Sequence, residues 1–294
     1  MIHKTIFFIT LLISVYGTLS AQGLMDELEK EEDSLNIQTV EEATFKGNRL
    51  INGHSVETDG KGQLTFLISH RFGRINGGAY EFFGLDESNI RLGLEYGVTD
   101  RLSIGIGRSS FEKVIDGFVK YQLLQQQSGA REVPLTITAF TSMAINTLRN
   151  ENPERELQFK SRVDYTYQLL MARKFSSNLS LQLMPTLVHR NLVATADMDN
   201  NLFALGVGGR YKLTNRLALN VEYYYRINAE AEESIYYNPI AIGFDIETGG
   251  HVFQLHFTNA QAMIEEGFIT ETTGNFFSGD IHFGFNISRV FQLK

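Results

Sequence analysis

Residues Ile90–Val98 have the sequence Ile-Arg-Leu-Gly-Leu-Glu-Tyr-Gly-Val, in which every second residue is large and apolar. The residues between them are charged or glycine. Successive side chains of a β-strand point to opposite faces, so this stretch predicts a strand with one apolar and one polar face. Thr99, Asp100 and Arg101 follow, and the alternation restarts at Leu102. This spacing predicts a tight hairpin turn between two strands.

The same period recurs along the chain after Gly60. Residues 174–183 and 212–221 repeat the turn and strand start of residues 97–106. Alternating apolar stripes lie within twelve stretches: 64–68, 90–98, 102–106, 119–123, 133–139, 163–171, 179–183, 203–211, 217–225, 240–246, 253–257 and 281–287. The sequence therefore predicts an all-β chain of about 12 antiparallel strands.

The second face of these strands is polar. In the last stretch it carries Asp280, His282, Gly284 and Asn286. In a transmembrane barrel the apolar stripe faces lipid and the polar residues line the lumen. A soluble β-sandwich or a lipocalin-like barrel, in which the apolar stripe faces a core, is the alternative.

The lengths of the connections favour the membrane barrel. Short connections lie near residues 99–101, 175–178, 214–216 and 247–250, with 125–132 in the same series. The intervening ones are long and polar, at 71–88, 145–158, 189–200, 227–238 and 259–278, apart from a short one near 108–113. Short turns at one end and long loops at the other are typical of bacterial outer-membrane barrels. We therefore predict an antiparallel up-and-down transmembrane β-barrel in the outer membrane of a Gram-negative bacterium, with the N- and C-termini on the periplasmic side.

The N-terminal 21 residues predict a removable signal peptide. Lys4 precedes the apolar run Ile6–Val15, and the segment ends at Leu19-Ser20-Ala21, whose last two residues are small. A membrane anchor or a buried helix is the alternative, but the run is shorter than the roughly 20 residues of a spanning helix. Eight of the 34 acidic residues lie between positions 22 and 42. We expect residues 22–59 to form an acidic periplasmic lead-in, flexible or partly helical, and residues 60–294 to form the barrel.

Composition excludes several classes of protein. The chain has no cysteine, which excludes a disulfide scaffold, a thiolate metal site and a lipid anchor on cysteine. Outside the acidic segment the charges nearly balance, so no basic surface for nucleic acid is expected. We expect no cofactor, and membrane lipid as the main contact of the apolar face.

Catalytic and metal-binding patterns are weak. The seven histidines have no local ligand spacing. Ser69 and His70 are adjacent on one predicted strand, so their side chains point to opposite faces and cannot pair for nucleophilic catalysis. The chain has no Gly-x-Ser-x-Gly motif. We expect no enzyme, no catalytic residue and no metal site, with a lipid-acting enzyme as the alternative.

Charged residues in the polar phase of several strands predict a feature of the lumen. The candidates are Arg91, Glu95, Arg162, Asp164, Arg210 and Glu222. Opposite charges in a low-dielectric interior pair strongly, whereas an unpaired buried charge is costly. Our hypothesis is an interstrand ion-pair belt that narrows the middle of the barrel. The alternative is a wide lumen in which these charges are solvated and each pair contributes little.

Several stretches resemble a family of uncharacterised bacterial outer-membrane β-barrel proteins, catalogued as a domain of unknown function. They are Arg49–Thr58, Ile68–Tyr80 with Phe83–Asp86, and Gly249–Met263. The resemblance covers about residues 43–294. It implies the barrel and the envelope location, and it implies no activity.

Polar residues within these stretches predict a second feature. Asn52, His54, His70 and Arg71 lie in polar, turn-rich sequence, so we expect them at the barrel entrance or in a plug. Together with the charged face, they favour a narrow, porin-like channel or a small-solute binding protein. The alternative is a non-conducting structural barrel that docks an envelope partner through the acidic segment and the long loops.

Overall fold

The structure is a computed structural model, and it describes residues 38–41, 43–129, 131–150, 158–229, 235–248 and 251–293. The predicted signal peptide and most of the acidic segment lie outside these residues. Contacts divide the chain into two units. In the smaller unit β1 (Thr39–Val40) pairs with β6 (Gln127–Ser128) in a two-stranded antiparallel sheet. The larger unit contains the remaining strands.

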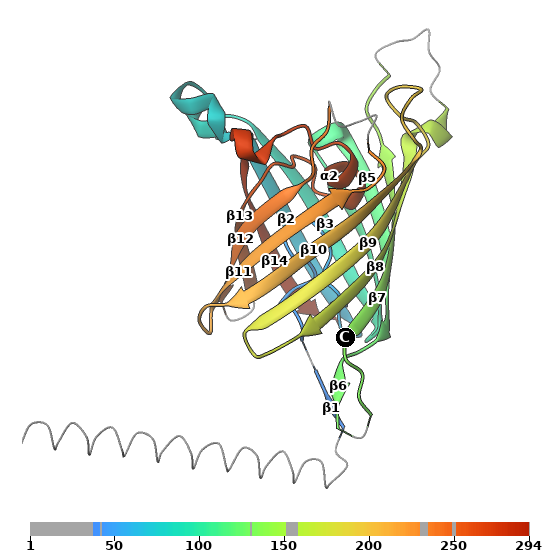
Figure 1. Cartoon of the computed structure of the whole chain (residues 1–294), viewed down its shortest axis with the longest axis vertical. Coiled ribbons are helices and arrows are strands. Elements are labelled where there is room, and N and C mark those ends of the chain that lie inside the picture. Colours follow the sequence, from blue (N-terminus) through green and yellow to red (C-terminus); the bar gives the residue numbers. More distant parts are fainter. Residues whose placement is uncertain are drawn as a thin grey trace, which may run out of the picture. The chain divides into compact units, whose positions relative to one another are not determined.

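Twelve antiparallel strands of the described chain close into a barrel. Figure 1 shows this barrel. They are β2 (Gln63–Arg74), β3 (Ser88–Thr99), β4 (Leu102–Ser109), β5 (Val114–Leu124), β7 (Thr136–Asn146), β8 (Val163–Lys174), β9 (Leu179–Arg190), β10 (Asn201–Lys212), β11 (Leu217–Arg226), β12 (Ile240–Thr248), β13 (His251–Thr258) and β14 (His282–Gln292). Each strand pairs with its neighbours in the chain, and β14 closes the barrel by pairing with β2. The predicted fold class and strand count are confirmed.

The two faces of the strands are those that the alternation predicts. On β3, Leu92 is 46% exposed on the outside, whereas its neighbour Arg91 is 1% exposed on the inside. Leu94, Ile104, Ile106, Val119, Phe203 and Leu205 are likewise exposed large apolar residues. The apolar stripe therefore covers the outer surface of the barrel, and the polar stripe lines its interior.

Two strands differ in extent from their sequence stripes. β2 continues to Arg74, because Phe72 keeps the outward apolar phase after His70. β7 begins at Thr136 rather than at Val133, because Val133 pairs instead with Gln127 of the small sheet. As expected, β4 and β5 are joined by a short connection, which contains the helix η2 (Phe111–Lys113).

The helices are short and lie in the connections. η1 (Ile75–Gly84) joins β2 to β3, η3 (Phe159–Arg162) precedes β8, and α2 (Glu265–Thr270) and η5 (Phe276–Ser278) lie between β13 and β14. None of the described helices is long and apolar enough to cross a membrane. We call the end that carries these connections the long-loop end and the opposite end the short-turn end. β2 begins and β14 ends at the short-turn end.

Two segments that belong to no wall strand fill the barrel interior. We call residues 43–59 the plug and residues 259–275 the inserted loop, whose helix α2 lies between the strands at the long-loop end (Figure 1). A buried apolar cluster joins plug, inserted loop and wall: Phe45, Leu50, Val56, Phe268, Ile269, Phe118, Phe140, Leu170, Met184 and Tyr224 are among its members. The core of the protein is therefore inside the barrel.

The expected boundary at residue 60 differs from the structure. Residues 43–59 belong to the barrel unit, and Leu50, Ile51 and Val56 are at most 1% exposed. Residues 43–59 are largely buried, because their mixture of apolar and turn residues packs into the lumen instead of extending into solvent.

Candidate functional site

The plug is a compact turn closed by its own hydrogen bonds. The Leu50 N–H donates to the Gly53 carbonyl at 2.9 Å, and the Ser55 N–H donates to the Asn48 carbonyl at 3.0 Å. At its base, the Glu57 carboxylate accepts the N–H groups of Thr44 and Phe45 at 2.8 and 2.9 Å. These contacts bring the two ends of the plug together and present the turn at residues 50–54 to the wall.

The tip of this turn is bound by one wall carboxylate. Glu222 of β11 accepts the N–H groups of Ile51, Asn52 and Gly53 at 3.0, 3.1 and 3.1 Å. A carboxylate is acceptor-only and has about four lone-pair sites, so one side chain satisfies three consecutive donors. Gly53 permits the close approach, since a Cβ there would lie 2.4 Å from the Tyr224 hydroxyl. Glu222 is thus an anchor for the plug rather than a partner of another wall charge.

Wall amides and hydroxyls satisfy the main chain of the plug. Gln182 of β9 donates to the His54 carbonyl at 2.8 Å and accepts the Val56 N–H at 2.8 Å. Asn286 of β14 donates to the Ile51 carbonyl at 2.9 Å, and Thr138 of β7 donates to the Val56 carbonyl at 2.7 Å. Gln254 and Lys120 donate to the Leu50 and Glu57 carbonyls. Side chains from several wall strands therefore satisfy the main chain of the plug, which pairs with no wall strand among the residues that the structure describes.

Two of the four predicted entrance or plug residues meet directly. The Arg71 guanidinium of β2 donates to the Asn52 side chain at 2.6 Å, and the Asn52 amide donates to Thr258 at 3.3 Å. His54 is also in the plug, where its ring packs 4.4 Å from the Phe118 ring and 4.5 Å from the Phe140 ring.

His70 takes no part in the plug. It faces outward on β2 and stacks on Phe285 at 4.8 Å, because adjacent strand residues point to opposite sides. The neighbouring Ser69 is buried inside the barrel, so these two residues form no catalytic pair.

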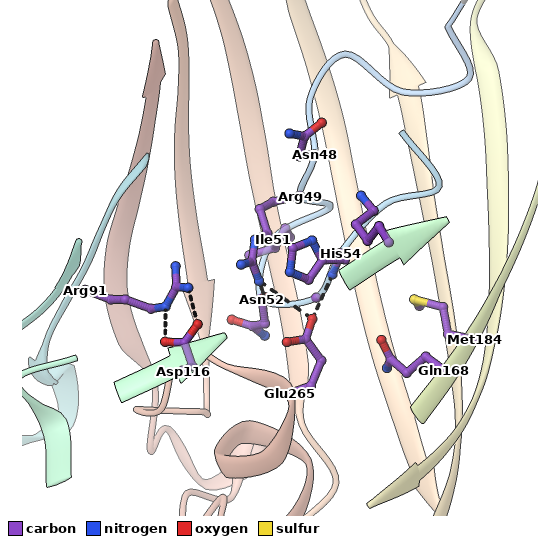
Figure 2. Close-up of polar contacts among 12 residues, drawn as sticks. Asn48, Arg49, Ile51, Asn52, His54, Arg91, Asp116, Gln168, Met184 and Glu265 are labelled. Carbon is purple, nitrogen blue, oxygen red and sulfur yellow. Dashed lines mark hydrogen bonds and ion pairs between the residues drawn. The ribbon is translucent and has the colours of Figure 1, made fainter. Parts of the chain in front are cut away.

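The plug and the inserted loop meet at Glu265. Figure 2 shows this carboxylate of α2 beneath Arg49 and His54. The His54 N–H donates to Glu265 Oε1 at 3.0 Å, and Arg49 Nη1 lies 3.6 Å from the same atom. Arg49 Nη2 also lies 3.6 Å from Glu95 Oε1 of β3. One plug guanidinium thus bridges a wall carboxylate and an inserted-loop carboxylate.

The six charges of the hypothesised belt lie in the structure at separate places. Arg91 pairs with Asp116 of β5 at 2.9 Å (Figure 2), and Arg210 pairs with Asp245 at 3.2 Å and Glu247 at 2.7 Å. Glu95 and Glu222 face the plug, whereas Arg162 and Asp164 lie at the long-loop end. Among the described residues, no ion pair joins two of the six. Charge pairing does occur in the lumen, but not as one belt of these residues.

The sequence reasoning missed the partners that decide this arrangement. Asp116 and Asp245 stand in the polar phase of their strands, which indicates that they face the lumen but not which charge each one meets. Arg49 lies in one of the family-like stretches, and Glu265 comes two residues after another. Their pairing depends on how the plug and the inserted loop fold inward, which alternation does not encode.

Space remains at both ends of the filled lumen. A cavity of about 220 Å³ lies between the plug and strands β2, β3, β12, β13 and β14, with Lys46, Arg49, Glu95 and Asp245 in its lining. A second, of about 350 Å³, lies at the long-loop end beside α2. Within the described part of the chain, no group of three or more His, Asp or Glu side chains is arranged to hold a metal ion.

Comparisons with solved structures give porins and other barrels. The NanC porin is similar over 79% of this chain and 99% of its own, with a TM-score of 0.47 and 10% identity. An outer-membrane channel from Pseudomonas putida F1 is similar over 80% of this chain and 98% of its own, with a TM-score of 0.43 and 14% identity. Outer membrane phospholipase A from Escherichia coli is similar over 82% of this chain and 95% of its own, with a TM-score of 0.43 and 12% identity.

The sequence comparisons are more specific. No functionally curated protein matches the sequence significantly. A family model described as a membrane bound beta barrel domain (DUF5777) matches residues 45–291, which include the plug as well as the barrel. Because this match covers most of the chain, the protein belongs to the family of membrane bound beta barrel domains, DUF5777.

Proposed function

We propose that this protein is an outer-membrane channel for small polar solutes that its plug and inserted loop hold closed. The observation that carries the proposal is how the lumen is filled. The wall lines it with hydroxyl, amide and carboxylate side chains, among them Ser103, Thr138, Gln168, Gln182, Thr186, Asn220, Glu222, Gln254, Thr258 and Asn286. A separate segment of the chain, rather than these side chains, occupies much of the space between them.

Such a lining suits a passage that opens. A hydrogen bond between plug and wall can be exchanged for bonds from each group to water, so its net contribution is about 0.5–1.5 kcal/mol between neutral groups and about 1.5–3 kcal/mol where a charged group takes part. Withdrawal of the plug also leaves the twelve-stranded hydrogen-bonded ring intact, because the wall strands pair with one another. Twelve strands lie between filled eight-stranded barrels and open sixteen-stranded porins, which fits a narrow passage.

The charges of the lining favour small polar solutes without a strong preference for one sign. Arg91 and Arg210 of the wall are already paired with Asp116 and Asp245. Withdrawal of the plug would expose the carboxylates of Glu95 and Glu222 together with the cations of Arg71 and Lys120, which bind Asn52 and the Glu57 carbonyl of the plug. We place the short-turn end in the periplasm, as in other outer-membrane barrels, so that the plug enters from that side.

A non-conducting barrel that docks an envelope partner is the second candidate. The filled lumen favours it, since plug and inserted loop meet at Glu265 inside the barrel. Release of the plug distinguishes the two candidates, because it should open a conducting path in a channel and none in a structural barrel.

Single-channel recording of the full-length protein in planar bilayers tests the proposal. Wild type should be mostly silent, and Glu222→Ala, which leaves three plug N–H groups without their acceptor, should give stable conductance steps. Asn220→Ala is the matched control: Asn220 lies on the same inward face of β11 and makes no hydrogen bond to the plug among the described residues. A folded Glu222→Ala barrel that stays silent while protease cuts its released plug would support the structural barrel instead.

A further inference from the structure

The cavity at the long-loop end is lined by an excess of carboxylates. Glu112 before β5, Asp164 of β8, and Glu266 and Glu271 of the inserted loop border this space of about 350 Å³. Arg149 and Arg162 are the guanidinium groups in its lining. Arg162 already donates to the carbonyls of Asn146 and Leu148, at 3.3 and 2.6 Å. The cavity therefore offers more negative than positive charge to a ligand.

Glu266 is the most buried carboxylate in the lining of this cavity. Its side chain is 8% exposed, and its carboxylate makes no hydrogen bond or ion pair within the part of the chain that the structure describes. The adjacent Glu265, in contrast, accepts the His54 N–H and pairs with Arg49. A buried carboxylate without a donor is costly when ionised, and a bound cation removes that cost. Burial, together with the charge of Glu271, raises the pKa of Glu266 well above its usual value.

The other residues of the lining indicate which kind of cation fits the cavity. Val114 and Ala144 are buried apolar residues of β5 and β7, and the exposed Leu148 also lies in the lining. In the described residues no three acidic or histidine side chains converge on a point where one metal ion could sit. The volume lies within the range of pockets for small organic molecules, about 300–1,000 Å³. The space thus combines separated carboxylates with a hydrocarbon surface.

We propose that this cavity binds a small organic cation, whose primary ammonium group pairs with Glu266 and whose hydrocarbon part lies against Val114 and Ala144. A second ammonium group can reach Glu112 or Glu271, which line the same space. This proposal does not depend on conductance, because a closed barrel can bind the ligand in this cavity.

Isothermal titration of the full-length protein in a non-ionic maltoside detergent tests the proposal. A zwitterionic detergent is avoided, since its quaternary ammonium headgroup would compete for the site. The probe is 1,4-diaminobutane at pH 7.5, compared at equal ionic strength with the neutral 1,4-butanediol and with calcium chloride. Saturable binding of the diamine alone is expected. No saturable binding, equal binding of the diol, or equal binding of calcium overturns the proposal.

Two variants place the ligand in the cavity. Glu266→Gln keeps the shape of the side chain and should weaken diamine binding about tenfold or more, because it removes a buried charge-assisted contact. The matched control is Glu81→Gln, an exposed carboxylate of η1 at the same end that lines neither cavity, and it should bind like wild type. Unchanged binding by a folded Glu266→Gln protein overturns the proposal. If that variant does not fold, Glu112→Gln takes its place: weakened diamine binding supports the proposal and unchanged binding overturns it.

Discussion

The main-chain N–H of His54 donates a 3.0 Å hydrogen bond to the carboxylate of Glu265, and this contact joins two segments that enter the barrel from opposite ends. His54 belongs to the plug, which precedes β2 in the chain, and Glu265 belongs to the loop between β13 and β14. The Arg49 guanidinium forms an ion pair with the same carboxylate. The centre of the lumen is therefore occupied by contacts between two non-wall segments.

Replacement of Glu222 by alanine should loosen the plug. Three N–H groups lose their acceptor, and each buried unsatisfied donor costs about 1–3 kcal/mol unless water reaches it. We expect protease cleavage within residues 43–59 at low denaturant, while the barrel still resists. Glu222→Gln, which retains one acceptor oxygen, should be intermediate. Cleavage of wild type and Glu222→Ala at the same rate would contradict the anchoring role of Glu222.

The Arg91–Asp116 pair joins β3 to β5 in the interior, and its two partners should depend on each other. Arg91→Leu leaves a buried carboxylate unpaired and should lower the free energy of unfolding by about 3–5 kcal/mol. Arg91→Leu combined with Asp116→Leu should recover most of that loss, because no isolated charge remains. Urea unfolding in lipid vesicles measures this cycle. Additive losses in the double variant would show that the two side chains do not interact.

The outer surface should respond to charge according to depth. Leu205 lies near the middle of β10 and faces outward, so Leu205→Arg should destabilise the barrel by about 2–4 kcal/mol in a bilayer. Leu213, in the turn after β10, is the matched control, and Leu213→Arg should cost about 0–1 kcal/mol. Equal losses at both positions in vesicle unfolding would refute the lipid-facing assignment of Leu205.

The inserted loop should become less stable as the pH rises. Burial, followed by the negative charge of Glu112, raises the pKa of Glu271 to about 7. The same carboxyl ionises at about pH 4.3 in the unfolded chain. Ionisation of Glu271 therefore costs the folded state no stability below that pH, an increasing amount as the pH rises, and the full amount above about pH 7. Hydrogen exchange of the α2 amides should therefore be faster at pH 8 than at pH 5, after correction for the intrinsic rate. Glu271→Gln should reduce this difference, and an unchanged difference would assign it to another group.

The alternation of apolar and polar residues predicted most of the strands of the barrel wall. At residues 90–98 it identified both the strand and its two faces, because the period of two is a local property of the chain. Pairing across strands is different: Arg91 meets Asp116 across β4 and not its neighbour Glu95, since the register of distant strands is set by closure of the ring.

The plug was harder to predict. Leu50, Ile51 and Val56 follow no strand or helix period, so nothing local distinguishes them from a solvated lead-in. Their burial depends on a cavity that exists only after the twelve strands have closed. The polar residues Asn52 and His54 gave the better signal, because turn residues beside apolar ones in a family-like stretch indicated an entrance or plug.

The most direct test of the plug as a gate uses a reversible lock between plug and wall. A Cβ at Gly208 would lie 2.7 Å from the Leu50 Cδ1 atom, and the chain has no cysteine of its own. Leu50→Cys with Gly208→Cys, in the Glu222→Ala background, should therefore allow one disulfide to fix the plug. The measurement is single-channel conductance of that protein before and after reduction. We predict silence when oxidised and stable conductance steps when reduced. Equal conductance in both states, or silence in both, would contradict a channel closed by its plug.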